Sequence, residues 1–187
     1  MNNNLHFNWA ELYHILKQES RKVYSQDEWD SHISVVFRNA VYILKRRAQY
    51  INGTEITLSL SIAHDLIEDY KEIGENCING VFDYLLHGSS DTNLARKIFL
   101  NDLDYLTRRG GEFYFDYIDR IVSSRNRNIL IVKLADLEAN ISRAKEDSSR
   151  LQKYVFAYRE IFLALSKIEL TEELEKMMEK FKSVTHK

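Results

Sequence analysis

Apolar residues recur along the chain at the three- and four-residue intervals of an α-helix. Trp9, Leu12 and Leu16 share one helical face near the start, and Val36 and Ala40 do the same in the next apolar segment. The pattern predicts helices over residues 8–22, 28–48, 54 or 57 to 70, 75–87, 91–107, 111–124, 126–146, 149–167 and 171–183. The chain is therefore predicted to be all-α, a bundle of about eight to nine helices.

Composition supports the same fold class. The 187 residues include no proline and only six glycines. Strand-rich folds use both residues in their many tight turns, so their scarcity favours helices joined by short polar loops. The length fits the roughly 100–200 residues of one domain, and 44% hydrophobic with 29% charged residues is typical of a globular protein. We therefore expect a single domain over residues 1–187.

Charge and cysteine content exclude several classes of function. The formal net charge is −2 at pH 7, so the field of the whole molecule does not attract nucleic acid or an acidic membrane. No apolar stretch reaches the roughly 18–20 residues of a membrane span, and the start lacks the pattern of a secretory signal. Cys77 is the only cysteine, which excludes an intramolecular disulfide. We expect a cytoplasmic protein that binds neither nucleic acid nor membrane; its oligomeric state stays open.

Four chemically active side chains crowd into the apolar segment LSIAHDLIED, residues 60–69. Taken as one helix, this segment stacks His64 with Glu68 and Asp65 with Asp69, because each pair is four residues apart. His64 and Asp65 are then close enough to reach one metal ion from a single turn. The segment is a candidate metal-binding and catalytic element.

A second unusual stretch is the apolar run NILIVKLADLEAN, residues 128–140, with Asp136 at its centre. A carboxylate in so apolar a helix needs a cation or a hydrogen-bond network. A metal ion shared with His64 and Asp65 would meet this need, and His32 from an earlier helix would supply a fourth ligand. Two histidines and two aspartates suit manganese, iron or zinc.

Simpler interpretations exist for each of these residues. His32 alone is consistent with a hydrogen-bonded core histidine. Residues 64–69 are consistent with an acidic helix face. Asp136 is consistent with an ion pair to Lys133 or to an arginine. The order of the three elements favours the metal site, because a histidine, a His-Asp pair and a buried aspartate follow one another along the chain.

This order resembles that of the HD-domain metal-dependent phosphohydrolases. AHDLIED (63–69) resembles the HDxxED element of the Rel/SpoT (p)ppGpp hydrolases and of the stand-alone small alarmone hydrolases, which include the metazoan SpoT homologue. VKLADLEAN (132–140) is similar to their KLADRLHN element, and LTRRGGEFYFDYI (106–118) to the LTRRxGExYxxYI stretch of bacterial and phage-type members. Residues 153–158 resemble the helix that closes the domain. The resemblance covers residues 10–170, the motif-bearing core, and leaves a C-terminal helix over 171–183.

The resemblance implies a function and a set of site residues. The metal ligands would be His32, His64, Asp65 and Asp136, with Mn²⁺ the expected ion. Glu68 and Asp69 would form the catalytic pair that positions and deprotonates the attacking water. The substrate-binding residues would be Arg21, Lys22, Lys133, Asn140 and Arg143. The implied reaction is hydrolysis of guanosine 3′,5′-bis(diphosphate) at its 3′-diphosphate, giving GDP or GTP and pyrophosphate. No residues remain for a synthetase domain, so we expect degradation only.

Two departures from the family pattern keep other substrates open. RKVYSQDEWDSHI (21–33) lacks the glycine and both prolines of the family's RKxxGxPYIxHP, and Leu-Glu-Ala replaces Arg-Leu-His at 137–139. The alternatives are a nucleoside monophosphate, an NADPH 2′-phosphate or another signalling nucleotide. A non-catalytic nucleotide-binding HD module and a helical interaction protein without a site also remain. The amphipathic helix over 171–183 is expected to pack on its own domain.

Overall fold

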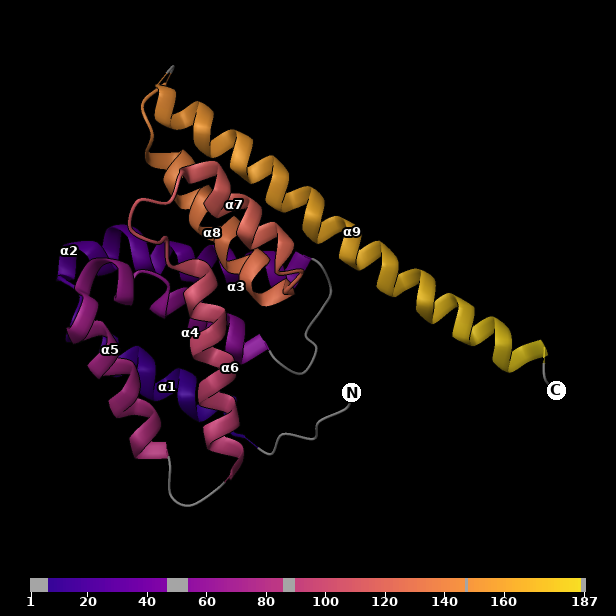
Figure 1. Cartoon of the computed structure of the whole chain (residues 1–187), viewed down its shortest axis with the longest axis horizontal. Coiled ribbons are helices and arrows are strands. Elements are labelled where there is room, and N and C mark those ends of the chain that lie inside the picture. The colour runs from indigo at the N-terminus through magenta and orange to yellow at the C-terminus, as the bar shows by residue number, and fades with distance from the viewer. Residues whose placement is uncertain (1–6, 47–53, 86–89, 147, 186–187) are drawn as a thin grey trace.

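The computed structural model describes residues 7–46, 54–85, 90–146 and 148–185. Its elements are α1 (Trp9–Ser20), α2 (Gln26–Glu28), the π-helix η1 (Trp29–Ile33), α3 (Ser34–Arg46), α4 (Thr54–Ala63), α5 (Leu66–Leu85), α6 (Ser90–Leu106), α7 (Tyr114–Ser123), α8 (Arg127–Arg143) and α9 (Ser149–Thr185) (Figure 1). The prediction of an all-α bundle of about eight to nine helices is confirmed for this part of the chain.

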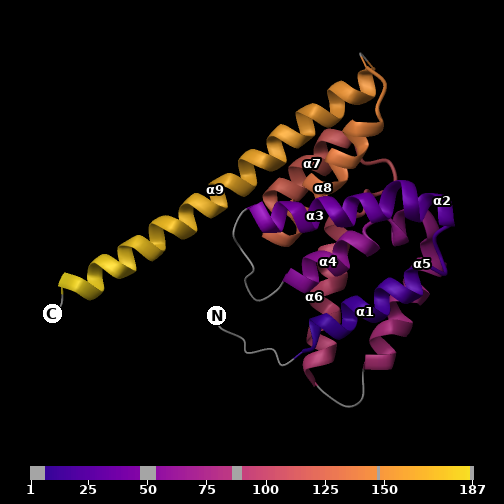
Figure 2. The same cartoon turned by 180° about the vertical axis from the view of Figure 1, so that it is seen from behind.

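Helix α8 is the central element of the bundle. It packs against α3, α4, α6, α7 and α9, and Figure 2 shows α3 and α4 on the side that Figure 1 hides. Its residues from Ile129 to Val132 are all buried, as are Leu134 to Leu137. A helix that is apolar on every side is stable only where neighbours cover it on every side. The apolar run seen in the sequence therefore fixes the middle of the fold.

Helix α9 differs from the sequence prediction, which divided it into helices over 149–167 and 171–183. It is one continuous helix from Ser149 to Thr185. The residues that face the core recur as far as Leu165 and Ile168, and beyond them the apolar positions shift to another face while the backbone stays helical. Because no glycine or proline interrupts this stretch, the backbone stays helical through the change of face.

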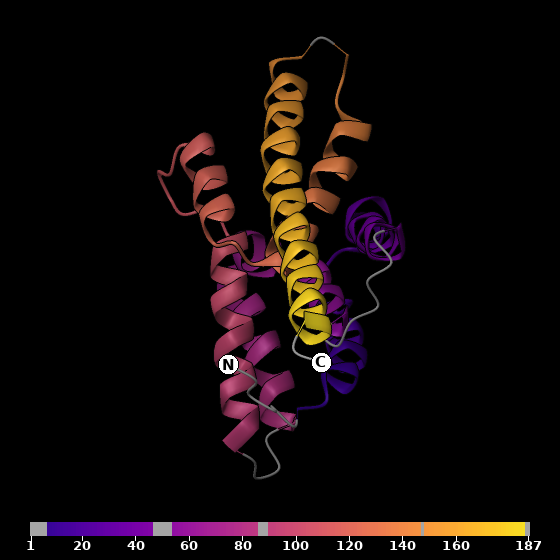
Figure 3. The same ribbon diagram turned by 90° about the vertical axis from the view of Figure 1, so that its right-hand side faces the viewer.

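The C-terminal part of α9 extends beyond the other helices, as the yellow end in Figures 1 and 2 and the end-on view of Figure 3 show. Leu170, Leu174 and Met177 are exposed there. The expectation that this segment packs on its own domain is therefore wrong. Among the described residues, no helix combines the length and the apolar character needed to cross a membrane.

The segment expected as one helix over residues 60–69 is broken. Helix α4 ends at Ala63 and α5 begins at Leu66, with a turn between them. The Nδ1–H of His64 donates to the carbonyl of Ser61 at 3.0 Å. In a continuous helix this carbonyl would accept the backbone N–H four residues later, so the His64 side chain competes with the helix for it. The interpretation of this stretch as one continuous helix is wrong at its functional residue.

A second irregularity lies inside α5, where the sequence predicted a break between residues 70 and 75. Lys71 has φ 47° and ψ −121°, a conformation that side chains rarely adopt, and the helix kinks there. The kink brings Gly74 against the backbone of Leu66. A Cβ atom on Gly74 would lie 2.0 Å from the carbonyl oxygen of Leu66, so only glycine fits this contact.

We predict that Gly74→Ala lowers the free energy of unfolding by about 3 kcal/mol, because the backbone of Leu66 must move to admit the methyl group. Gly80→Ala in the same helix is the matched control, since nothing lies within 4 Å of its Cβ position. This control should raise stability by about 0.5–1 kcal/mol through helix propensity. Urea denaturation measures both, and equal effects of the two substitutions would contradict the close contact.

Candidate metal centre and its pocket

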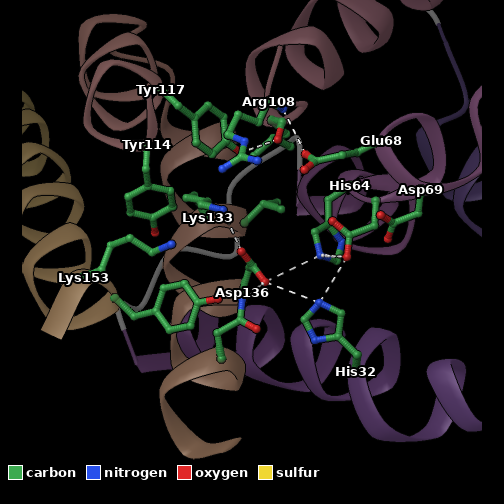
Figure 4. A pocket seen from close by; sticks show the side chains of 15 residues that line it. His32, His64, Glu68, Asp69, Arg108, Tyr114, Tyr117, Lys133, Asp136 and Lys153 are labelled. Carbon is green, nitrogen blue, oxygen red and sulfur yellow. Dashed lines mark hydrogen bonds and ion pairs between the residues drawn. The ribbon is translucent and has the colours of Figure 1, made fainter. Parts of the chain in front are cut away.

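Four side chains from three segments converge on one point of the structure (Figure 4). His32 comes from η1, His64 and Asp65 from the turn between α4 and α5, and Asp136 from the middle of α8. The Nε2 of His32 lies 3.1 Å from Asp65 Oδ2 and 3.4 Å from Asp136 Oδ1. The Nε2 of His64 lies 3.1 Å and 3.8 Å from the same two oxygens. The structure thus brings together all four predicted metal ligands.

Three of these four spacings are close to those of a metal coordination shell, and the 3.8 Å spacing is longer. With bonds of about 2.1 Å, neighbouring ligand atoms lie about 3.0 Å apart in an octahedron and about 3.4 Å apart in a tetrahedron. The ligand atoms of His32, His64 and Asp136, all buried, lie within 4.8 Å of one another, and Asp65 adds a fourth at the pocket side. Small adjustments would therefore seat a divalent ion, and the donor set fits manganese, iron or zinc.

His64 is oriented so that its Nε2 faces the two carboxylates. Its Nδ1–H is used by the Ser61 carbonyl, and the buried Nε2 has no hydrogen-bond partner among the described residues. Burial opposes the charged ring, but the carboxylates of Asp65 and Asp136 outweigh it and raise the pKa of His64 to about 9. Burial likewise opposes the Asp65 carboxylate, yet His64 and His32 hold its pKa well below the usual range. A proton and a metal ion compete for this Nε2.

His32 is held differently, by Arg143 from the C-terminal end of α8. A nitrogen of the Arg143 guanidinium lies 2.8 Å from His32 Nδ1 and 2.8 Å from the side-chain oxygen of Asn140. Because guanidinium can only donate, His32 Nδ1 accepts and the ring proton lies on Nε2, which donates to Asp65. A neutral imidazole that coordinates through Nε2 carries its proton on Nδ1, so ion binding would require His32 to change tautomer and Arg143 to give up this hydrogen bond.

Asp136 is the buried centre of the cluster, and each of its oxygens has a separate role. Oδ2 accepts from Lys133 Nζ at 2.8 Å, while Oδ1 accepts from Asn140 Nδ2 at 2.6 Å and faces both imidazoles. Burial opposes the Lys133 charge, but Asp136 raises the lysine pKa well above its usual value. The ion pair with Lys133 therefore exists together with the histidine cluster, so the two interpretations of Asp136 are compatible.

The predicted catalytic pair lies in the first turn of α5, at the edge of the same pocket. Glu68 Oε2 accepts the backbone N–H of Arg108 at 3.0 Å, which fixes one side of its carboxylate. Burial and the charges of Asp65 and Glu68 raise the pKa of Asp69 to about 6. A carboxylate with a pKa near neutrality is suited to accept a proton at physiological pH.

The pocket has a volume of about 260 Å³, and the cluster of His32, His64, Asp65 and Asp136 forms one of its walls. The opposite wall carries two cations, Arg108 and Lys153, and three tyrosines, Tyr114, Tyr117 and Tyr154. In Figure 4 the labelled members of this wall face the cluster across the cavity. Neither cation forms an ion pair among the described residues. The pocket is therefore acidic on one side and basic and aromatic on the other.

The loop between α6 and α7, which carries Arg108, is held in place by several hydrogen bonds. The Arg120 guanidinium donates to both oxygens of Glu112 at 2.8 and 2.9 Å and to the carbonyl of Thr107 at 3.0 Å. The hydrogen bonds from Arg120 hold the pKa of Glu112 at about 2, so the pair stays charged. Tyr117 also donates to the carbonyl of Leu106. These bonds fix the loop that carries Arg108.

Three predicted substrate-binding residues do not line this pocket. The guanidinium of Arg21 lies over the Trp29 ring, 5.1 Å from its centroid, beside a different cavity. Lys22 is exposed and pairs with Glu19 at 2.6 Å. Arg143 lies behind His32, as described above. Lys133 and Asn140 do line the pocket, next to Asp136.

Sequence reasoning assigned no role to Arg108, Lys153 or the three tyrosines. Their segments, 106–118 and 153–158, were singled out only for their resemblance to a family. The Lys153 Nζ lies over the Tyr114 ring, 4.4 Å from its centroid, and the buried Tyr114 hydroxyl has no hydrogen-bond partner among the described residues. Burial raises the pKa of Tyr114 to about 12. The signal available in the sequence is that both segments combine a cationic residue with one or more tyrosines.

Comparison of the chain with models of protein families, with curated proteins and with solved structures finds no match. The interpretation of the site therefore depends on its residues and geometry.

We predict that Mn²⁺ binding tightens by about tenfold per pH unit between pH 7 and 9 and levels off above. The reason is that His64, with its pKa raised to about 9, is protonated at pH 7 and must lose its proton to bind the ion. Calorimetry in buffers of different ionisation enthalpy should record the released proton. The His64→Gln variant should bind no Mn²⁺ at any pH. If the Mn²⁺ affinity of the unmodified protein did not change with pH, this result would argue against coordination by the His64 imidazole.

Proposed function

We propose that the protein is a metal-dependent phosphohydrolase that cleaves a phosphate ester or anhydride of a purine nucleotide, as an HD-domain enzyme does. One observation carries the proposal: a four-ligand His/Asp cluster and an unpaired cationic, aromatic wall face each other across one pocket. A metal site alone would not need Arg108 and Lys153, and an anion site alone would not need the carboxylates.

The proposed ion is held by His32, His64, Asp65 and Asp136, and Mn²⁺ is the first choice. When bound, it supplies Lewis-acid activation of a water molecule and of the phosphate under attack. The chain orients these ligands through hydrogen bonds behind them. Ser61 fixes His64, and Lys133 with Asn140 fixes Asp136. Such supporting contacts keep ligand geometry and protonation suited to the ion.

The proton of the attacking water goes to the Glu68–Asp69 pair. The contact between Glu68 and the Arg108 backbone aims this carboxylate along the pocket edge. Asp69, with its pKa raised to about 6, can hold the proton near neutral pH. Because the acceptor must be deprotonated to work, activity with saturating metal is expected to fall as the pH drops below about 6.

The opposite wall provides the contacts that a nucleotide diphosphate requires. Arg108 and Lys153 carry charge that no carboxylate of the described residues neutralises, and phosphate oxygens would neutralise it. Tyr114 and Tyr154 are half-buried and offer flat faces for a base or sugar, and the ring of Tyr114 already packs under Lys153. These features favour a substrate with at least two phosphates and an aromatic base.

Guanosine 3′,5′-bis(diphosphate), cleaved to GDP and pyrophosphate, is the first-choice substrate. A second candidate is another nucleotide, such as a nucleoside monophosphate or an NADPH 2′-phosphate. The observation that favours this second candidate is that Arg21 and Lys22 lie outside the pocket, so the residues that would contact the base differ from the family pattern. A panel of nucleotides separates the two candidates.

The test is incubation of the purified protein with guanosine 3′,5′-bis(diphosphate) and Mn²⁺, with a chelator control, and identification of products by anion-exchange chromatography. We expect GDP and pyrophosphate that disappear with the chelator. Unchanged nucleotide from a preparation that contains stoichiometric metal would exclude this substrate, and the panel would follow. Failure on the whole panel would leave a nucleotide-binding module.

Glu68→Gln is expected to keep the metal and lower kcat by a factor of about 10²–10⁴, because it removes a proton acceptor without touching a ligand atom. Elemental analysis of the purified variant measures the metal, and phosphate or pyrophosphate release measures turnover. Loss of the metal in this variant would show that Glu68 belongs to the coordination shell and that the division of roles is wrong.

Lys153→Met is expected to raise KM about tenfold or more with a smaller change in kcat, because the lysine neutralises a phosphate that does not react. The matched control is Arg150→Met on the same helix, since Arg150 is exposed and does not line the pocket. Steady-state kinetics of both variants measures KM and kcat and tests this expectation. An unchanged KM for Lys153→Met would remove the lysine from the substrate site.

A further inference from the structure

Helix α9 carries a second row of apolar residues that stays largely exposed, although its first member, Phe156, meets Phe115 of α7 with ring centroids 5.2 Å apart. Phe156, Leu163, Leu170 and Met177 follow one another at intervals of seven, and their exposed fractions are 48, 51, 59 and 67%. Leu174, exposed by 52%, lies between the last two. Single exposed apolar residues are ordinary, but a continuous row along one helix marks an interaction surface.

This row faces away from the rest of the molecule. The residues of α9 that pack into the core end with Leu165 and Ile168. At 100° per residue, Leu170 lies about 200° around the helix axis from Ile168, and Met177 lies about 180° from it. The C-terminal part of the row is thus on the opposite side from the core-facing residues, on the stretch of α9 that extends beyond the other helices (Figures 1 and 3).

The spacing in the C-terminal part of α9 is that of a coiled coil. Leu170, Leu174 and Met177 alternate steps of four and three residues, and the sequence continues the same alternation at Phe181 and Val184. Apolar residues at strict 4-3 spacing form the narrow row that pairs with one other helix, in contrast to the wider face that packs on a globular core. The face therefore fits a single helical partner.

Charges beside this row favour an identical chain in the antiparallel direction. The segment is acidic first, with glutamates at 169, 172, 173 and 175, and then mainly basic, with lysines at 176, 180 and 182. If Leu170 and Leu174 occupy positions d and a, then position g holds Glu173 in one heptad and Lys180 in the next. In an antiparallel pair positions g face each other, so glutamate meets lysine twice.

We propose that the α9 face defined by Leu170, Leu174 and Met177 pairs antiparallel with the same face of a second copy of this chain. The layers would place Leu170 against position 181 of the other chain and Leu174 against its position 177. The seam is short, so the interface should fall in the size class below about 1,200 Å² that weak, transient complexes occupy. We expect the dimer to dissociate in the micromolar range.

Sedimentation velocity of the full chain from low to several hundred micromolar tests the pairing. The mass should rise from 22.1 kDa toward twice that value. Leu174→Glu should stay monomeric throughout. Ile73→Glu is the matched control, because Ile73 is an exposed isoleucine on α5 and its variant should dimerise like the parent chain. Circular dichroism should show both variants folded.

Charge exchange tests the partner and the direction. Glu173→Lys and Lys180→Glu should each weaken the dimer on the order of tenfold at low salt, because both place like charges in opposing g positions. Mixing the two variants should restore the affinity, since lysine then meets glutamate twice. A parent chain that stays monomeric, a dimer that survives Leu174→Glu, or a mixture that remains weak would each overturn the proposal.

Discussion

The structure depends on one buried carboxylate, that of Asp136 in the middle of an apolar helix. An unpaired charge there would destabilise the bundle by several kcal/mol, so partners must reach it from every side. Lys133 and Asn140 do so from the same helix, and His32 and His64 do so from η1 and from the turn after α4. The packing of α3 and α4 on α8 therefore builds the hydrophobic core and the His/Asp cluster in the same step.

The irregular parts of the backbone lie where the site needs them. His32 is on the π-helical turn of η1, and His64 with Asp65 lies where the helix breaks. Lys71 kinks α5 one turn after the acidic pair Glu68 and Asp69. Regular helices would present these side chains at fixed 100° intervals, whereas the breaks aim two segments at one point. The backbone strain at Lys71 is offset by the packing around it.

Much of this arrangement could be predicted from the sequence. Hydrophobic spacing and the absence of proline predicted the helices, and the type and order of His32, His64–Asp65 and Asp136 predicted that these side chains meet. The break at His64 could not be predicted, because it depends on a side-chain hydrogen bond to Ser61 that competes with the helix. The wall that carries Lys153 could not be predicted either, since it requires knowing that α9 lies beside α7 and α8. The local sequence pattern shows the periodicity of each helix, and tertiary packing decides which helix faces contact one another.

The charge distribution in the pocket restricts what can bind there. A divalent cation alone would satisfy the His/Asp cluster and leave Arg108 and Lys153 facing it without counter-ions. An anion alone would be attracted to these two residues and repelled by Glu68 and Asp69 on the other wall. A phosphate group accompanied by a divalent cation satisfies both walls together, because each charge then faces its opposite at short range. The site is therefore best matched by a ligand pair, which is the requirement of metal-assisted phosphoryl chemistry.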